Sequence, residues 1–346
     1  MNFKMFQRHL KCHQIEKNKI IFTKKNEIII KDYNFNKTNY FSVSVDGSLN
    51  YFLFSKSYFL SKILRKEIFN LSSYKTNFVF SYNGNIYLNF DELFNEYRGS
   101  RPLRILNDFH NKKILFGEYF DNKNRNSVNV FCKKNESKWE SVYTFKPGLI
   151  RHIHNIIYDS YVNKYIILTG DTSKESKILS FDSKFKNFEI ISQGSQLSRS
   201  IDIIPLIDGY IIPTDTPKQK NWIYFLDRKG NIKSKSTVKG SIFHICQYQN
   251  FFLASTALEP SNVNNQSFVY MYGSFDGLNW VELFKLEKKH PIFLSKLLRY
   301  PEIELTKNIH KSFKYIPFYF RNIKGFIDGT YFLSKNEIIQ KINNEF

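Results

Sequence analysis

The sequence lacks the segments that usually mark a secreted or membrane protein. Its first residues, MNFKMFQRHLKCH, are interrupted by Lys4, Arg8 and Lys11, so they contain no apolar core of a signal peptide. No later run reaches the ~18 apolar residues of a membrane span. The three cysteines are widely separated and include no C-x-x-C pair. We therefore expect a reduced, cytoplasmic protein with no membrane span.

Several motifs of common enzymes are also missing. No Walker P-loop, G-x-G-x-x-G, G-x-S-x-G or H-E-x-x-H pattern occurs, so a nucleoside triphosphatase, a serine hydrolase or a zincin is not predicted. The net charge of +20, from 51 Lys and Arg against 31 Asp and Glu, is typical of a protein with an anionic partner, but it also fits a lysine-rich surface that is simply solvated, which is the favoured interpretation. No arginine-rich arm, helix-turn-helix or zinc signature concentrates this charge, so nucleic acid is not favoured as that partner. The sequence does not indicate an oligomeric state.

Long amphipathic helical patterns are scarce, and the best candidates are short, at residues 59–69 and 291–300. Elsewhere apolar and polar residues alternate, with turn residues every 8–12 positions, which is typical of an all-β fold. We expect one domain that spans residues 1–346.

A weak internal repeat divides this β-rich chain. From residue 152 it has the strand order HIHNIIYD, KYIILTGD, SKILSFD and NFEII, and similar sets begin near residues 101, 199 and 241. Their spacing of 42 to 51 residues fits the ~40–50 residues of a four-stranded propeller blade. The clearest blades cover residues 101–145, 152–191, 199–236 and 241–286. Hairpin-like segments at about 20–95 and in the tail predict a six-bladed β-propeller, with five or seven blades still open, closed by pairing of the terminal strands.

One turn carries a family signature. SFDGLNW (Ser274–Trp280) resembles the Asp-box, or BNR repeat, of sialidase-like propellers, although it is one residue short, and CKKNESKW, which ends at Trp139, resembles a partial copy. Asp-boxes are turns in which the Asp accepts backbone hydrogen bonds and the Trp packs beneath. Residues 98–285 as a whole resemble BNR-type, glycosidase-like proteins associated with bacterial surface-polysaccharide genes. The resemblance implies a propeller in a carbohydrate context. The arginine box F/Y-R-I-P of many sialidases is absent, so it implies no particular reaction.

Acidic and basic residues recur at corresponding ends of the predicted strands. Because the first two strands of a blade are antiparallel, the start of the first and the end of the second share one edge. The acids at second-strand ends are Glu118, Asp171, Asp215 and Glu259. The basic residues at first-strand starts are Arg101, Arg104, His152, His154 and Arg199. Charged groups gathered at one edge are costly to desolvate unless they bind a ligand or pair with each other, and single acids also brace turns.

His152 and His154 lie two residues apart, so on a regular strand they face one side together with Tyr158. Packed, hydrogen-bonded histidines are one interpretation. A metal site completed by Asp171 or Glu118 is a lesser alternative, because H-x-H alone is a weak zinc pattern. We therefore predict no metal cofactor.

Glycoside hydrolysis needs two carboxyl groups, or a carboxyl group with an activated tyrosine. Asp171 and Glu118 are the first candidates, with His152, His154 and Tyr158 as further catalytic candidates and Tyr119 as a second tyrosine. Arginine binds a substrate carboxylate with its planar fork, and amides suit sugar hydroxyls. The predicted substrate-binding residues are Arg101, Arg104, Arg125, Glu175, Gln196, Arg199, Asp215, Glu259 and Asn262.

These features lead to three functional hypotheses. The first is a glycosidase-like enzyme that acts on an anionic glycan or activated sugar in surface-polysaccharide biosynthesis. The second is a polysaccharide lyase or glycosyl-transferring enzyme on the same scaffold. For a lyase, His152, His154 or Tyr158 would abstract the proton next to a uronate carboxylate and Arg199 would stabilise the enolate. The third is a non-catalytic propeller that binds glycan or protein. The expected partner is an anionic carbohydrate or sugar conjugate.

Overall fold

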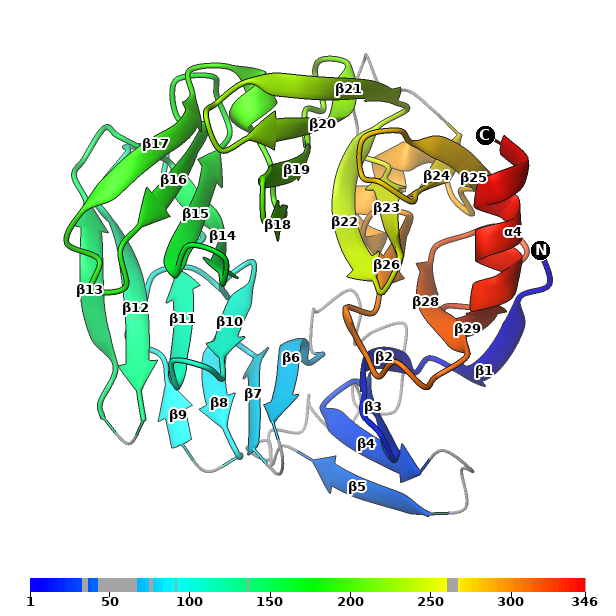
Figure 1. Cartoon of the computed structure of the whole chain (residues 1–346). Helices are drawn as coiled ribbons and strands as arrows, with labels where there is room; N and C mark the ends of the chain where they lie inside the picture. The colour runs from blue at the N-terminus through cyan, green and yellow to red at the C-terminus, as the bar shows by residue number, and fades with distance from the viewer. Residues whose placement is uncertain are drawn as a thin grey trace. The chain divides into compact units, whose positions relative to one another are not determined.

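The computed structural model describes residues 1–32, 37–42, 67–74, 77–90, 92–135, 137–259 and 267–345. Nearly all of the regular structure in these residues is β-strand (Figure 1). The chain divides into two compact units. Unit 1 comprises Met1–Phe69 and Lys239–Phe346, and unit 2 comprises Asn70–Val238.

Unit 2 contains four sheets of four strands among its described residues, and the strands follow chain order in each. The first sheet, which starts at the last residue of unit 1, comprises β6 (Phe69–Tyr74), β7 (Asn77–Tyr82), β8 (Asn85–Leu88) and β9 (Glu92–Phe94). The second comprises β10 (Ile105–Asp108), β11 (Lys113–Gly117), β12 (Val128–Lys134) and β13 (Glu140–Phe145). The third comprises β14 (His152–Asp159), β15 (Lys164–Gly170), β16 (Lys177–Phe181) and β17 (Phe188–Gln193). The fourth comprises β18 (Ile204–Leu206), β19 (Gly209–Pro213), β20 (Asn221–Asp227) and β21 (Ile232–Val238).

Unit 1 contains three further sets of four strands among its described residues. One set comprises β2 (Lys11–Ile15), β3 (Lys19–Lys24), β4 (Glu27–Asp32) and β5 (Thr38–Ser42), with the short β27 (Asn308–Ile309) parallel to β2. The second comprises β22 (Ser241–Tyr248), β23 (Phe251–Ala257), β24 (Phe268–Ser274) and β25 (Val281–Glu287). The third comprises β26 (Glu302–Leu305), β28 (Tyr315–Arg321), β29 (Gly329–Ser334) and β1 (Lys4–Arg8).

The two ends of the chain share that last set, because β1 pairs antiparallel with β29. A strand near each end of the chain thus takes part in this pairing, as the sequence predicts, while closure of a ring by it stays a prediction. Apart from the short β27, the described strands can be grouped into seven sets of four, two of which are joined into one eight-stranded sheet by the pairing of Ala257 in β23 with Glu302 in β26. Seven is the upper end of the predicted range of five to seven blades. Four of the sets coincide closely with the predicted blades at 101–145, 152–191, 199–236 and 241–286.

The described helices are short. They are η1 (Gln196–Ser198), η2 (Ile292–Leu294), α3 (Ser295–Leu298) and α4 (Lys335–Glu345). The helical prediction at 291–300 is confirmed, whereas most of the 59–69 candidate lies outside the described residues. The hairpin-like segment predicted in the tail contains the strand β29, but its last residues belong to the helix α4. Ile338 and Ile342 lie one turn apart on α4 and are both buried, and Gly273 of β24 leaves room for Ile342, because a Cβ there would lie 2.9 Å from it.

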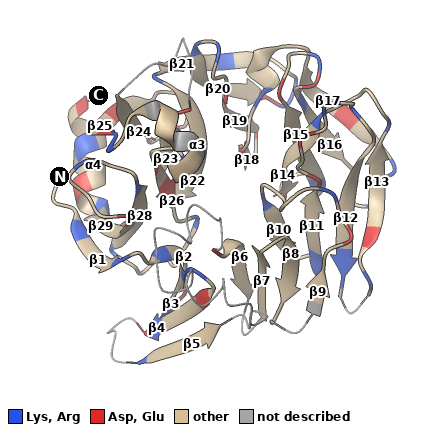
Figure 2. Cartoon of the chain, turned by 180° about the vertical axis from the view of Figure 1, so that it is seen from behind, with Lys and Arg blue, Asp and Glu red and all other residues tan. Residues whose placement is uncertain are grey.

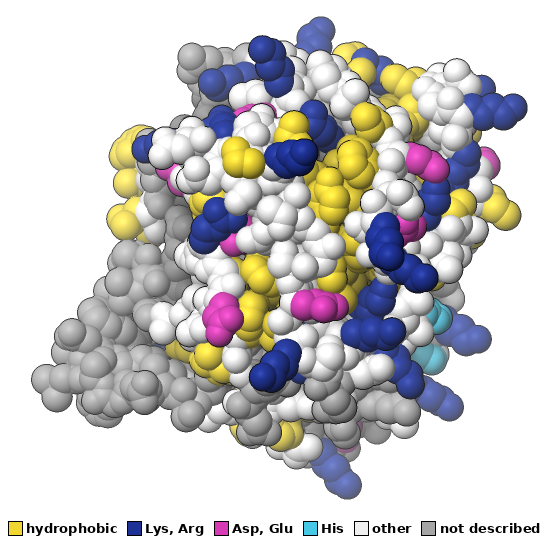
Figure 3. All heavy atoms as spheres, turned by 90° about the vertical axis from the view of Figure 1, so that its left-hand side faces the viewer, with side chains coloured by type: hydrophobic (Ala, Val, Ile, Leu, Met, Phe, Trp, Pro, Cys, Tyr) yellow, Lys and Arg dark blue, Asp and Glu magenta, His cyan; other side chains and the backbone are white. Residues whose placement is uncertain are grey.

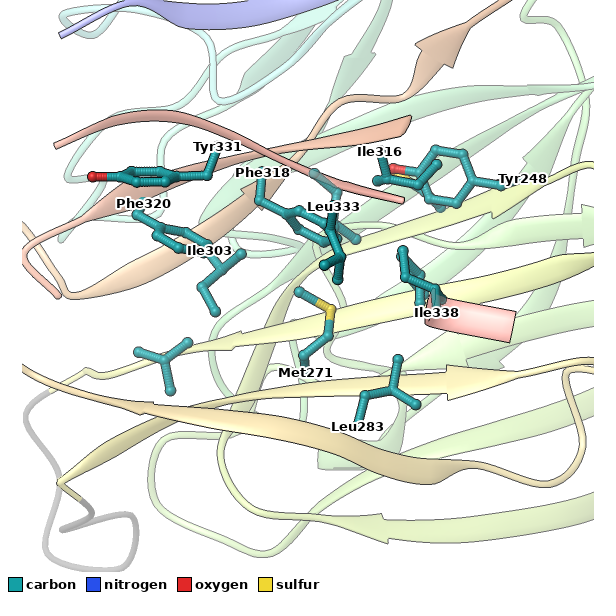
Figure 4. Close-up of a cluster of buried hydrophobic side chains, with 14 of the residues drawn as sticks. Tyr248, Met271, Leu283, Ile303, Ile316, Phe318, Phe320, Tyr331, Leu333 and Ile338 are labelled. Carbon is teal, nitrogen blue, oxygen red and sulfur yellow. The ribbon is translucent and has the colours of Figure 1, made fainter. Parts of the chain in front are cut away.

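The hydrophobic core explains why inner strands are apolar on both faces. In unit 1, Met271, Phe318 and Leu333 pack with residues of α4 in one buried cluster (Figure 4). In unit 2 the central strand β15 has six consecutive buried residues, while the outer strand β17 is mostly exposed. Burying a large aliphatic or aromatic side chain contributes about 1.5–3 kcal/mol. The buried side chains of the inner strands therefore contribute most of the packing energy of each sheet.

Aspartates brace the turns between the third and fourth strands. Asp276 accepts backbone hydrogen bonds from Leu278 (2.8 Å) and Asn279 (2.9 Å), and Trp280 Nε1 donates to the Gly277 carbonyl. This is the geometry expected of the Asp-box turn. Asp182 and Asp227 brace the corresponding turns of unit 2 in the same way. The turn recurs more widely than the tryptophan signature indicates.

Basic residues are spread over both units rather than gathered in one segment (Figure 2). On the face drawn in Figure 3, Lys and Arg alternate with acidic, hydrophobic and uncharged side chains. None of the helices in the described part of the chain has the length and apolar character to span a membrane. The three cysteines are buried and unbridged.

Candidate functional site

The predicted acids do follow second strands. Glu118 comes directly after β11, Asp171 directly after β15, and Asp215 two residues after β19. His152 is the first residue of β14 and pairs with Gly170 of β15. Antiparallel pairing thus brings His152 next to Asp171, as predicted. Arg151, His152, His154, Asp171 and Arg199 are called the histidine cluster below.

His154 reaches this edge because β14 is irregular there. Its pairing with β15 shifts between Ile153 and Asn155, so His154 is the extra residue of a β-bulge. Gly170, the pairing partner of His152, lies against this ring, and a Cβ there would come within 2.5 Å of His154. The absence of a side chain at Gly170 therefore makes the space for this imidazole. Both histidines are buried.

Backbone carbonyls orient both rings. His152 Nδ1 lies 3.1 Å from the Phe120 carbonyl and His154 Nδ1 lies 2.9 Å from the Ser200 carbonyl. A carbonyl can only accept, so each Nδ1 is the protonated donor. The two Nε2 atoms consequently face each other at 3.2 Å, and Tyr119 packs on His152 with ring centroids 4.3 Å apart.

Asp171 joins these groups. Its Oδ1 lies 3.4 Å from His152 Nε2 and 3.5 Å from His154 Nε2, and its Oδ2 accepts a hydrogen bond from Arg151 at 2.9 Å. Burial raises the pKa of Asp171, but the hydrogen bonds and charges of His152 and His154 outweigh it and hold the pKa well below the usual range. Asp171 is therefore a carboxylate at neutral pH.

Arg199 links Asp171 to Asp215. Its guanidinium donates to the Asp171 backbone carbonyl at 3.2 Å and lies 3.5 Å from a carboxylate oxygen of each aspartate. Gln196 donates to the same Asp171 carbonyl at 3.1 Å. Gln196 and Arg199 thus fix the backbone that carries Asp171, and the structure brings them together with Asp215 as the sequence predicts.

Glu118 is occupied by other partners. It is buried, and it accepts hydrogen bonds from the backbone N–H of Arg98 (3.0 Å), from Arg98 Nε (2.9 Å) and from the backbone N–H of Asn129 (2.8 Å), with a further contact to Arg98 Nη2. These donors satisfy both carboxylate oxygens. The contacts favour a bracing role for Glu118, which holds the 98–129 segment together.

Arg125 and Glu175 pair with each other. Arg125 Nε donates to Glu175 Oε1, and Thr172 Oγ1 donates to Glu175 Oε2 at 2.8 Å. Burial raises the pKa of Glu175, but the hydrogen bonds from Arg125 and Thr172 lower it overall. Their charges compensate each other beside the histidine cluster, so neither is an uncommitted substrate-binding group.

Of the other predicted residues, Tyr158 is separated from this cluster. Tyr158 lies at the other end of β14, six residues or about 20 Å along the strand from His152, and it donates to Asn163. The expectation that Tyr158 shares a face with the histidines is wrong, because the bulge at His154 breaks the alternation. Arg101 and Arg104 lie in the segment before β10, where the charge of Arg101 acts on Tyr97. Glu259 follows β23 in unit 1, and Asn262 lies outside the described residues.

The sequence reasoning missed Arg151 and Arg98. Arg151 immediately precedes the first strand of its sheet, which is the position that drew attention to Arg101 and Arg199. It bridges Asp171 to Asp121 Oδ1, which lies 2.5 Å from Arg151 Nη2. Arg98 lies 20 residues from Glu118, and no spacing in the sequence indicates that pair.

A second charged cluster, also missed, is buried in unit 1. It comprises Lys11, His244, Glu302, Glu304 and Arg321, and is called the unit 1 ionic cluster below. Arg321 contacts Glu302 and lies 2.5 Å from Glu304. His244 Nε2 and Lys11 Nζ meet the remaining oxygens of Glu302 and Glu304 at 3.1 and 2.5 Å.

Comparisons with known proteins identify the fold. No family model matches the chain, and no curated protein matches it. Among solved structures it is similar to the AfRom2 CNH domain, with a TM-score of 0.56 and 10% identity over 96% of this chain and 99% of that one. It is similar to YCF48 bound to D1 peptide (TM-score 0.56, 8% identity, 96% of each chain) and to BamB from Moraxella catarrhalis (0.52, 10%, 93% of this chain and 83% of that one).

These neighbours are β-propellers, and identities this low carry the fold alone. Together with the four-stranded sheets they show that the chain has the predicted all-β propeller fold. The propeller part of the sequence resemblance is thereby confirmed. Membership of the sialidase-like Asp-box family stays a prediction.

Proposed function

We propose that the chain is a non-catalytic binding propeller whose site in unit 2 takes the acidic group of an anionic carbohydrate or sugar conjugate. The observation that carries this proposal is the pairing of the candidate carboxylates. Glu118 is saturated by Arg98, Glu175 pairs with Arg125, and Asp171 is held as a carboxylate by the histidines. Glycoside hydrolysis needs one carboxyl group with a raised pKa to protonate the leaving oxygen. Binding of an anionic ligand does not require a carboxyl group with a raised pKa.

Arg151 is the side chain best placed to meet a ligand. Its side chain is 29% exposed, and one of its two partners, Asp121, is 58% exposed. An exposed ion pair contributes little to stability because water screens it. A ligand carboxylate can therefore replace Asp121 at the Arg151 fork at small cost and form two parallel hydrogen bonds. Lys123, 80% exposed and 3.6 Å from Asp121, adds positive charge at the same place.

The similar structures support a binding role. YCF48, which has the same fold, was solved bound to the D1 peptide. The glycosidase hypothesis has less support, since it rests on the sequence resemblance. Of the residues named for the lyase hypothesis, Tyr158 lies far along β14 from His152, so a histidine would have to act as the base.

Titration with a panel of uronate- and sialate-containing oligosaccharides tests the proposal, with product analysis of the same mixtures. We expect binding without turnover. Arg151→Gln should weaken binding about tenfold or more, because a hydrogen bond to a charged group contributes about 1.5–3 kcal/mol. Arg8→Gln, a change at an exposed arginine of unit 1, should leave affinity unchanged. Release of sugar products that Asp171→Asn abolishes would instead establish the glycosidase hypothesis.

A further inference from the structure

Three potential ligand atoms converge in the histidine cluster. His152 Nε2 and His154 Nε2 are 3.2 Å apart, and Asp171 Oδ1 lies 3.4 Å from the first and 3.5 Å from the second. Tetrahedral zinc binds imidazole nitrogen and carboxylate oxygen at about 2.0–2.1 Å, so neighbouring ligand atoms in such a site lie about 3.3–3.4 Å apart. The three distances are those of one face of a tetrahedral metal site.

The rings are oriented as metal ligands are. Each Nδ1–H donates to a backbone carbonyl, of Phe120 and Ser200, so a neutral ring has its lone pair on Nε2, and a charged ring has there the proton that a metal ion would replace. Two such lone pairs facing each other and a carboxylate repel unless a cation lies between them. The cation can be a proton on one buried imidazole or a metal ion. A proton on one Nε2 is donated to the other Nε2 or to Asp171 Oδ1, whereas a metal ion binds all three atoms at once.

The surrounding chain preserves this arrangement. The β-bulge at His154 and the missing side chain at Gly170 are both needed to place the second imidazole. Arg151 binds Asp171 through Oδ2 and so leaves Oδ1 toward the histidines. Asp171 is 23% exposed, which gives an ion a route from solvent.

Two positive charges face the group and oppose a cation. Arg151 is offset by Asp121, and Arg199 by Asp215, whose Oδ1 is buried and has no hydrogen-bond partner in the described part of the chain. The nearby charges of the arginines and aspartates therefore balance. Asp171 then leaves one negative charge in the cluster, which a bound cation can compensate.

We propose that His152, His154 and Asp171 bind one transition-metal ion of the zinc class through the two Nε2 atoms and Oδ1. Two imidazoles and one carboxylate suit Zn²⁺ and its neighbours, whereas Mg²⁺ and Ca²⁺ prefer oxygen ligands. Three protein ligands leave a fourth position open, as in catalytic and ligand-binding zinc sites. This replaces the sequence-based prediction that there is no metal. It does not depend on the binding function proposed for Arg151, and each can fail alone.

The experiment uses the full chain with any affinity tag removed, stripped with chelator and titrated with Zn²⁺ by calorimetry. One ion per chain should bind. His154→Gln and Asp171→Asn should each weaken binding at least tenfold, while His110→Gln, at an exposed histidine outside the cluster, should not change it. Circular dichroism of each variant reports whether it is folded.

Spectroscopy of the unmodified chain tests the same proposal without relying on the folding of any variant. X-ray absorption at the zinc edge should show two imidazole ligands and at least one oxygen, and Co²⁺ in the same site should give the visible absorption of a tetrahedral ion. The proposal is overturned by binding far below one ion per chain, by cysteine or oxygen-only ligation, or by unchanged affinity in a folded His154→Gln variant.

Discussion

Each unit contains a histidine close to a carboxylate and an arginine, yet the two clusters are built differently. In the unit 1 ionic cluster, each oxygen of Glu302 and Glu304 has its own partner. Arg321 takes one oxygen of each, His244 takes the second of Glu302, and Lys11 takes the second of Glu304. Both glutamates, His244 and Arg321 are buried.

The histidine cluster of unit 2 is less complete. Two imidazole nitrogens and Asp171 Oδ1 face one another, while Arg151 binds Asp171 through Oδ2 and Arg199 lies 3.5 Å from Oδ1. Asp171 and Arg151 remain partly exposed, whereas four of the five residues of the unit 1 ionic cluster are buried and Lys11 alone among them is partly exposed. A buried charge network in which each carboxylate oxygen has its own partner stabilises the fold. Ligand atoms that face each other at an accessible edge instead leave room for a bound ion or ligand.

The largest expected effect comes from breaking the enclosed cluster. Arg321→Met should lower the free energy of unfolding by about 3–5 kcal/mol, because it leaves Glu302 and Glu304 buried without their shared cation. Urea unfolding measures the change, and hydrogen exchange of β26 and β28 should show that it is local to unit 1. Arg8→Met, at an exposed position, is the matched control. A loss below about 1 kcal/mol would remove the distinction between the two clusters.

Much of the fold could be predicted because strand alternation is a local property of the chain. The four sheets from β10 to β25 follow the predicted blades, since their apolar residues recur with period two and turn residues separate them. The helix α4 was missed because only Ile338 and Ile342 of its residues are buried, so its apolar stripe is narrow. The number of blades could not be predicted reliably from the repeat, because the set with β26 and β1 combines strands from both ends of the chain.

The site could be predicted only in part. The end of a second strand and the start of a first strand are neighbours in any antiparallel pair, and this placed Asp171 beside His152. Ion-pair partners are set by tertiary contacts, so neither Arg98 with Glu118 nor Arg321 with Glu302 could be predicted from spacing. The bulge at His154, which moves Tyr158 off the shared face, also has no clear sequence signal.

Acid should act more strongly on the enclosed cluster. Burial raises the pKa of Glu304, but the charges of Lys11 and Arg321 hold it well below the usual range. Such a group stabilises the folded state fully above its unfolded pKa, about 4.3, and this contribution is lost as pH falls toward the folded value. Glu304→Gln should therefore lower stability at pH 7 by about 1–3 kcal/mol and flatten its decline between about pH 5 and 3.

Glu175→Gln in unit 2 is the companion variant. The pKa of Glu175 is also lowered, by Arg125 and Thr172, so the sign of the pH effect is the same. We expect a smaller change in slope, because Arg125 is partly exposed and solvent screens the pair. Urea titrations at a series of pH values measure both. If Glu175→Gln changed the pH dependence of the unfolding free energy more than Glu304→Gln, the expectation that acid acts more strongly on the unit 1 ionic cluster would be wrong.

The smallest effect is expected at the edge of the histidine cluster. Arg151→Gln should change the free energy of unfolding by less than about 1 kcal/mol, since its guanidinium is partly exposed and Asp171 keeps His152, His154 and Arg199 as partners. Thermal and urea unfolding measure this, with Arg321→Met as the contrasting arginine. A loss above about 2 kcal/mol would mean that Arg151 is as structural as Arg321. A stable Arg151→Gln variant with weakened ligand binding would show that Arg151 of the histidine cluster takes part in recognition. The loss of affinity could not then be attributed to unfolding.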